Sequence, residues 1–126
     1  MRKLFAFALV AMMLVACSSK YQTLPMDEFE KAIQEPDVVV VDVRTPREFS
    51  EGHIAGAINI DWKAGRFAEE AAQLLDKDKT IAVYCIHARR SKSAAEELQK
   101  MGYKHIIELQ GGLEYWINAG KPIVQE

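Results

Sequence analysis

VVVVDV, residues 38 to 43, is the stretch that decides the fold. Its valines leave no polar face, which is typical of a strand buried on both sides in a parallel sheet. TIAVYC, residues 80 to 85, is a second run of the same kind. Two fully buried strands in one short chain predict a central sheet that is covered by helices on both of its faces.

Shorter apolar segments extend this pattern toward both ends of the chain. Further strands are expected at residues 21–24, 57–60 and 105–109. Helices are expected after Pro25 and over residues 45–52, 65–75, 91–102 and 112–120. In the third of these helices, helical spacing predicts an apolar face formed by Phe67, Ala71, Leu74 and Leu75.

The order of these elements indicates the fold class. Because strands alternate with helices, the sequence predicts an α/β fold with a mainly parallel, five-stranded sheet flanked by helices on both faces. The length of 126 residues fits one domain, which we place at residues 21–126. In such sheets ligands bind at the carboxyl ends of the strands, where Asp42, Arg44 and Cys85 are expected to lie.

Residues 1–16 have the layout of a signal peptide. MRK supplies a positively charged start, and 13 uncharged, apolar residues follow and end at Ala16. This stretch is shorter than the roughly 20 residues that span a bilayer. It also lacks the polar face that a helix packed on a core would carry. We therefore expect this segment to direct export and to be removed.

The junction that follows indicates where the mature chain begins. LVAC, residues 14 to 17, resembles the lipobox of bacterial lipoprotein precursors. That resemblance implies cleavage before Cys17 and lipidation of its side chain, with residues 17–20 as a short tether to the membrane. Ser18 stands where an inner-membrane retention signal carries Asp. The resemblance therefore favours the periplasmic face of the outer membrane.

Charge and spacing argue against two classes of ligand. The 16 basic and 18 acidic residues give a net charge of −2, which becomes −4 when Arg2 and Lys3 leave with the signal peptide. With basic residues unclustered, we expect no binding of nucleic acid. The three histidines and two cysteines lack the C-x-x-C or H-x-x-x-H spacing of metal ligands, so no metal site is expected.

CIHARRS, residues 85 to 91, is the strongest candidate for chemistry. It leads from an expected strand end into an expected helix, where unpaired backbone N–H groups and the helix dipole favour an anion. Helix N-termini and nearby arginines also lower the pKa of a free cysteine, which is about 8.5. With Cys17 lipidated, Cys85 is the single free thiol, and these surroundings favour its thiolate.

From the loop sequence alone, a purely structural role for Cys85 remains open. Cysteine is among the most buried residue types and often serves as a small apolar filler. Arg89 and Arg90 are then solvated charges at a helix start, and Ser91 is an N-cap. Under this alternative the loop has no chemical role.

Three stretches together resemble the rhodanese family. VVDVRTPREFSEGHIAGAINID, residues 40 to 61, is similar to its first signature. CIHARRS carries a cysteine with an arginine five positions later, at residue 90, and LQGGLEYW, residues 109 to 116, resembles the closing Gly-Gly and Trp element. The resemblance runs from about residue 21 to residue 122, with the three motifs in the family's order.

This resemblance implies sulfur transfer without a cofactor. Cys85 is then the nucleophile, which takes sulfur from a donor such as thiosulfate and passes it from a persulfide to a thiol or cyanide acceptor. The resemblance makes residues 86–90 the binding loop, consisting of Ile86, His87, Ala88, Arg89 and Arg90. Arg90 closes the loop and orients the donor, while Asp42 and Arg44 support it.

The loop differs from the usual family sequence at three positions, and two alternative functions must be weighed against sulfur transfer. Many members have Arg-Ser-Gly after the cysteine, where this chain has Ile86, His87 and Ala88. Phosphatases and arsenate reductases that share the fold place the arginine one residue further on than Arg90, so this shorter loop disfavours them. A sulfur carrier or binding module without turnover needs the same cysteine and stays open.

Overall fold

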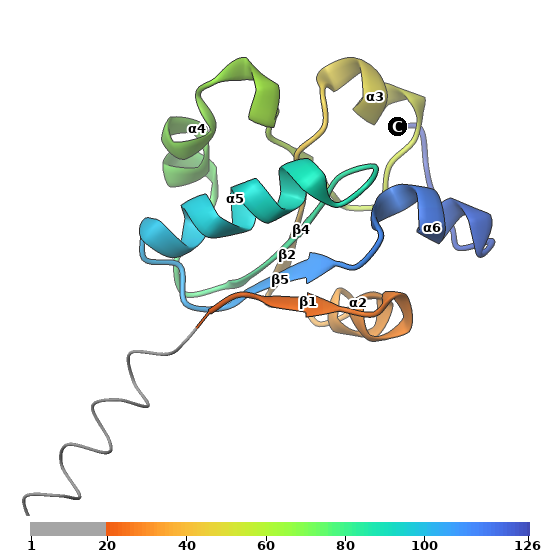
Figure 1. The fold of residues 1–126 in the computed structure, drawn as a ribbon, viewed down its shortest axis with the longest axis horizontal. Helices are drawn as coiled ribbons and strands as arrows, with labels where there is room; N and C mark the ends of the chain where they lie inside the picture. The colour runs from red at the N-terminus through yellow and green to blue at the C-terminus, as the bar shows by residue number, and fades with distance from the viewer. Residues whose placement is uncertain (1–19) are drawn as a thin grey trace, which may run out of the picture.

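The computed structural model describes residues 20 to 126. The expected signal peptide and Cys17 lie outside the described residues. The five strands form one parallel sheet in the order β1-β5-β4-β2-β3 (Figure 1). The strands are β1 (Gln22–Leu24), β2 (Val38–Asp42), β3 (Ile58–Asn59), β4 (Thr80–Tyr84) and β5 (Ile106–Leu109). The two apolar runs form strands β2 and β4, as the sequence predicts, and the structure places these strands side by side.

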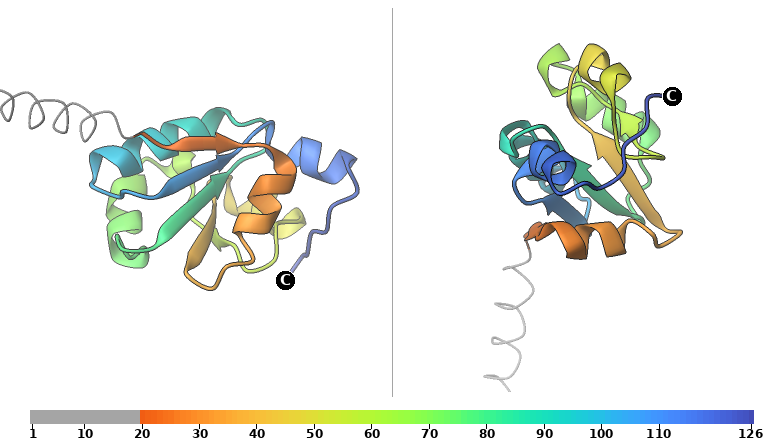
Figure 2. Two further views of the ribbon diagram at one scale, coloured as in Figure 1. Left: turned by 90° about the horizontal axis from the view of Figure 1, so that it is seen from below. Right: turned by 90° about the vertical axis from the view of Figure 1, so that its right-hand side faces the viewer.

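Helices connect the strands and cover the sheet. They are α2 (Met26–Ala32), α3 (Pro46–Glu51), the 3-10 turn η1 (Trp62–Ala64), α4 (Phe67–Leu74), α5 (Arg89–Lys100) and α6 (Gly112–Asn118). Figure 2 shows α2 on one side of the sheet and α4 with α5 on the other. The expected α/β fold with helices on both faces is therefore confirmed. Within residues 20 to 126, no helix is both long and apolar enough to cross a bilayer.

Alternating side chains of the central strands build the two layers of the core. Val41 and Val43 point into the layer beneath α4 and α5, together with Cys85. Val40 and Tyr84 point into the opposite layer, toward α2 and α6. Both faces of these strands are buried, which explains why their sequences show no polar alternation.

Two details of the helices differ from the sequence-based prediction. Phe67, Ala71 and Leu75 are buried, but Leu74 is 54% exposed and does not join their face. Leu75 follows the last residue of the helix and has an extended backbone, with φ −114° and ψ 129°, so its burial does not depend on the helical spacing used in the prediction. The helix after β4 begins at Arg89, so Ser91 lies in its first turn and is not its N-cap.

Candidate active site

Cys85 directly follows β4, at the carboxyl edge of the sheet and below the first turn of α5. Its side chain is 1% exposed, and its sulfur accepts a hydrogen bond from the Ser91 backbone N–H, with Sγ 3.3 Å from the nitrogen. The Leu113 N–H of α6 donates to the Cys85 carbonyl at 2.8 Å. The cysteine is thus held between the start of α5 and the start of α6.

The loop after the cysteine presents its backbone as a donor surface. The N–H groups of residues 86 to 90 donate to no acceptor among residues 20 to 126. Ala88 takes the left-handed conformation, with φ 68° and ψ 10°, immediately before α5. Successive unpaired N–H groups around such a turn form a concavity suited to an anion, and the helix dipole adds positive potential there.

The turn at the start of α6 closes the loop from behind. Gly111 and Gly112 have φ values of 78° and 77°, in the region that favours glycine. A Cβ atom at Gly112 would collide with the carbonyl of Ile86, to which the Glu114 N–H donates at 3.2 Å. The closing Gly-Gly element is therefore needed for α6 to approach the cysteine loop.

A pocket of about 380 Å³ opens above the sulfur, and three of the six residues that line it are lysine or arginine. It is lined by Lys63, Cys85, Ile86, His87, Arg89 and Arg90. Ala88, which was expected in the binding loop, does not line it, and Lys63 is a residue that sequence reasoning missed. Lys63 reaches this place from η1, which is distant in sequence from the loop. His87 is exposed, and its Nε2 lies 3.1 Å from Glu114 Oε1. The pocket is suited to a small anion.

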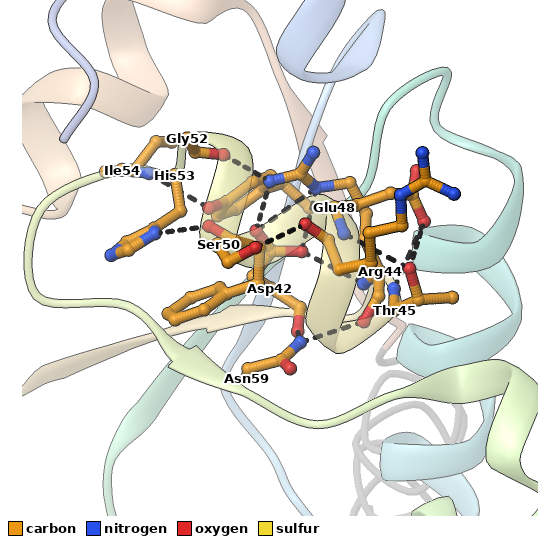
Figure 3. A network of polar contacts seen from close by, with 12 residues as sticks. Asp42, Arg44, Thr45, Glu48, Ser50, Gly52, His53, Ile54 and Asn59 are labelled. Atoms are coloured by element: carbon orange, nitrogen blue, oxygen red, sulfur yellow. Dashed lines mark hydrogen bonds and ion pairs between the residues drawn. The ribbon is translucent and has the colours of Figure 1, made fainter. Parts of the chain in front are cut away.

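Arg90 is oriented by a glutamate on α3. Its Nη1 and Nη2 donate to Glu48 Oε1 and Oε2 at 2.8 and 3.0 Å. These hydrogen bonds raise the pKa of Arg90 and lower the pKa of Glu48 to about 2. Glu48 is itself fixed by a capping box with Thr45 at the start of α3 (Figure 3). The pair therefore stays ionised through the neutral and mildly acidic range.

Asp42 and Arg44 form a separate, buried pair at the end of β2, shown in Figure 3. The Arg44 guanidinium bonds both carboxylate oxygens of Asp42, with Nη2 2.8 Å from Oδ2, and donates to the Gly52 carbonyl at 2.6 Å. Neither side chain hydrogen-bonds residues 85 to 91. They fix the segment after β2 that carries Glu48, so any support for the loop is indirect.

The described part of the chain offers no constellation for a metal ion. Among residues 20 to 126, no three His, Cys, Asp or Glu side chains gather closely enough to hold one. The site consists instead of a buried sulfur, a backbone donor surface and a cationic rim. Such an arrangement can stabilise a thiolate and hold an anionic reactant beside it.

Known proteins share this arrangement of sequence and fold. The family model for the rhodanese-like domain matches residues 25–119. The thiosulfate sulfurtransferase GlpE of Coxiella burnetii is 34% identical over 97 residues, which cover 76% of this chain and 87% of that protein. A sulfurtransferase of Allochromatium vinosum is 34% identical over 90 residues, covering 70% of this chain and 79% of its own.

A solved structure agrees with the sequence comparisons. The rhodanese-related protein from Thermoplasma volcanium has a TM-score of 0.73 and 35% identity, covering 84% of this chain and 100% of its own. The chain belongs to the rhodanese-like domain family.

Proposed function

We propose that this protein is a sulfurtransferase that forms a persulfide on Cys85. Membership of the rhodanese-like domain family and similarity to proteins named sulfurtransferases support the general activity. The observation that carries the proposal is the position of the Cys85 sulfur beneath a cationic pocket and beside unpaired backbone N–H groups. Thiosulfate, a small dianion with a transferable outer sulfur, fits that pocket in charge and size.

In the first half-reaction, the Cys85 thiolate attacks the outer sulfur of thiosulfate. A sulfur–sulfur bond forms on Cys85, the sulfur–sulfur bond of the donor breaks, and sulfite leaves with the electron pair. Arg90 orients the donor, and Lys63 with Arg89 attracts it to the pocket. The backbone N–H groups of residues 86–90 then hold the anionic persulfide.

In the second half-reaction, an acceptor thiolate or cyanide attacks the outer sulfur of the persulfide. The new bond forms to the acceptor, and the Cys85 thiolate leaves and is regenerated. Because the enzyme carries the sulfur between two separate substrates, ping-pong kinetics are expected. The chemistry uses no metal or organic cofactor.

A sulfur carrier without turnover is the second candidate function. It requires the same Cys85 persulfide but no reaction with a free acceptor. The exposed His87 and the half-buried Ile86 stand where many family members have Arg-Ser, so this loop offers a different surface to an acceptor. A phosphatase is disfavoured because Arg90 closes the loop five residues after the cysteine.

We also propose that Cys17 carries a lipid and holds the domain at the cell envelope, on the periplasmic face of the outer membrane. The lipobox-like LVAC and the preceding apolar stretch support this placement. Radiolabelled palmitate should enter the wild-type chain in cells but not a Cys17→Ser variant. Equal labelling of both would exclude lipidation at this residue.

The persulfide is tested by intact mass spectrometry of the reduced, full-length chain after incubation with thiosulfate. The expected result is a gain of one sulfur atom that is absent in Cys85→Ser, followed by loss of that sulfur and release of thiocyanate when cyanide is added. Reduction is needed first because a thiolate is readily oxidised in air.

Each outcome distinguishes the candidate functions. A persulfide without thiocyanate or acceptor turnover supports the carrier instead of the enzyme. Sulfur gained equally by Cys85→Ser contradicts the assignment of the nucleophile. A free, alkylatable Cys85 that gains no sulfur from thiosulfate or from a protein persulfide excludes both sulfur-based functions.

A further inference from the structure

A buried row of polar groups leads from Cys85 away from the pocket to Glu108 on β5. Ser91 Oγ lies 3.4 Å from Cys85 Sγ and 2.7 Å from Glu108 Oε2. None of these three residues is more than 1% exposed. A carboxylate is costly to bury at such a place, and the mechanism above gives Glu108 no role.

The burial of the Glu108 carboxylate is not explained by a tight ion pair. Thr23 Oγ1 donates to Oε1 at 2.8 Å. Lys92 Nζ approaches the same oxygen at 3.5 Å from a half-exposed side chain, longer than the about 2.7–2.9 Å of a strong charge-assisted hydrogen bond. Two hydroxyl groups are therefore the closest partners of this carboxylate, and one of them touches the sulfur.

The single hydrogen of the Ser91 hydroxyl couples the protonation of the Cys85 thiol to that of the Glu108 carboxylate. While Glu108 is ionised, Ser91 donates to it and presents a lone pair to Cys85, which suits an S–H donor. When Glu108 carries a proton, it can donate to Ser91 Oγ, and the Ser91 hydrogen turns to the sulfur. Ser91 then gives the thiolate two donors, its hydroxyl and its backbone N–H.

We propose that Glu108 accepts the proton of the Cys85 thiol by way of the Ser91 hydroxyl. Glu108 does not touch the sulfur, so it is a positioning residue that acts through Ser91. The S–H bond breaks as an O–H bond forms on Ser91, and the original Ser91 hydrogen passes to Glu108 Oε2. One proton moves across the row, and the net charge of the three groups does not change. The inference rests on the proposed function for the use of the thiolate, but the transfer itself needs no sulfur donor.

Other charged groups face the two ends of this row and must be separated from it. Lys63, His87, Arg89 and Arg90 surround the pocket above the sulfur, and Lys92 approaches Glu108. Of these, His87 is the residue type that titrates near neutral pH. A decisive test therefore changes Glu108 or Ser91 while leaving His87 in place.

The test is the rate of Cys85 alkylation by iodoacetamide as a function of pH, read on the Cys85 peptide of the reduced, full-length chain. When one proton is shared by two coupled groups, the thiolate appears in two steps. We expect two steps in the wild type and one step in Glu108→Gln and in Ser91→Ala. At about pH 6 the rate should fall about tenfold in both variants, the change that one unit of acidity produces.

The matched control is Glu96→Gln, which removes the same charge from an exposed position of α5 and should keep both steps. A single step in the wild type would overturn the inference, and so would a first step that survives in Glu108→Gln, since it would then belong to His87 or another group. If Glu108→Gln fails to fold, Ser91→Ala decides, because it cuts the row and leaves the carboxylate in place. The persulfide assay on the same samples tests the proposed function separately.

Discussion

Arg44 and Arg90 each bind a carboxylate through two nitrogen atoms of the guanidinium, yet the two pairs lie in different surroundings. The Arg44 and Asp42 side chains are 5% and 0% exposed, whereas those of Arg90 and Glu48 are 15% and 29% exposed. Arg44 also donates to the Gly52 carbonyl, so its Nε and Nη2 are both directed at protein acceptors. Arg90 borders the pocket above Cys85.

This difference separates a structural arginine from one that can meet a substrate. A buried pair cannot exchange its partner for a ligand without leaving a charge unpaired inside the protein. A pair at the rim of a pocket can rotate or share its donors with an incoming anion at a smaller cost, because water reaches both groups. Burial, and not the type of contact, therefore assigns the two arginines to different roles.

The largest effect is expected from breaking the buried pair. Arg44→Ala leaves the Asp42 carboxylate buried without its cation, and the free energy of unfolding should fall by about 3–5 kcal/mol. Urea denaturation of the purified full-length chain measures this loss.

The matched control for Arg44 is Arg47→Ala on the neighbouring helix α3. Arg47 pairs with Glu51 at 3.5 Å, but these side chains are 89% and 64% exposed. Its loss should change the free energy of unfolding by less than about 1 kcal/mol. If both variants lost the same stability, the Asp42–Arg44 pair would not be the structural support inferred here.

A smaller effect, on activity instead of stability, is expected from Arg90→Ala. A charge-assisted hydrogen bond to an anion contributes about 1.5–3 kcal/mol, so kcat/KM for thiosulfate should fall about tenfold to a hundredfold. The free energy of unfolding should change by about 1 kcal/mol or less, because the pair with Glu48 is partly solvated. Steady-state kinetics and urea denaturation of one preparation measure the two effects together.

Arg89→Ala is the comparison for Arg90. Arg89 lines the same pocket but is exposed, so its attraction for the donor acts mainly through solvent. We expect a smaller fall in kcat/KM that disappears as salt is added. Kinetics with thiosulfate that do not change in Arg90→Ala would remove Arg90 from the site.

The central features of the fold could be predicted because they depend on local patterns. The valine run of β2 and the apolar run of β4 identify strands buried on both faces. The spacing of Ala94, Ala95, Leu98 and Met101 marks the face of α5 that packs on the core, with Met101 partly buried. The start of α5 was harder to place. Its first residue follows a left-handed Ala88, a conformation that the identity of the residue does not indicate.

The partners of the active-site residues could not be predicted in the same way. The cysteine, the loop and Arg90 stand together in sequence, but Glu48 lies 42 residues from Arg90, and Glu108 lies 17 residues from Ser91. Lys63 joins the pocket from another connection. Such contacts depend on the order of strands in the sheet and on the path of each crossover, which hydrophobic periodicity does not specify.

The smallest expected effect concerns the backbone conformation of Ala88, the residue that immediately precedes Arg89 and Arg90. Among residues 20 to 126, Ala88 is the one non-glycine residue with a positive φ, at 68°. The left-handed conformation costs an L-residue about 1–2 kcal/mol, and glycine relieves it. Glycine also adds about 0.4–1 kcal/mol of entropy to the unfolded chain. Ala88→Gly should therefore raise the free energy of unfolding by about 1 kcal/mol or less, measured by urea denaturation.

The opposite sign is expected where alanine lies in a right-handed helix. Ala68→Gly on α4 should lower the free energy of unfolding by about 0.5–1 kcal/mol, since glycine gains nothing there. If Ala88→Gly destabilised the protein as much as Ala68→Gly, the loop conformation would carry no strain. A gain in stability would instead mean that this chain holds its cysteine loop in a strained backbone conformation, in which alanine is less mobile than glycine would be.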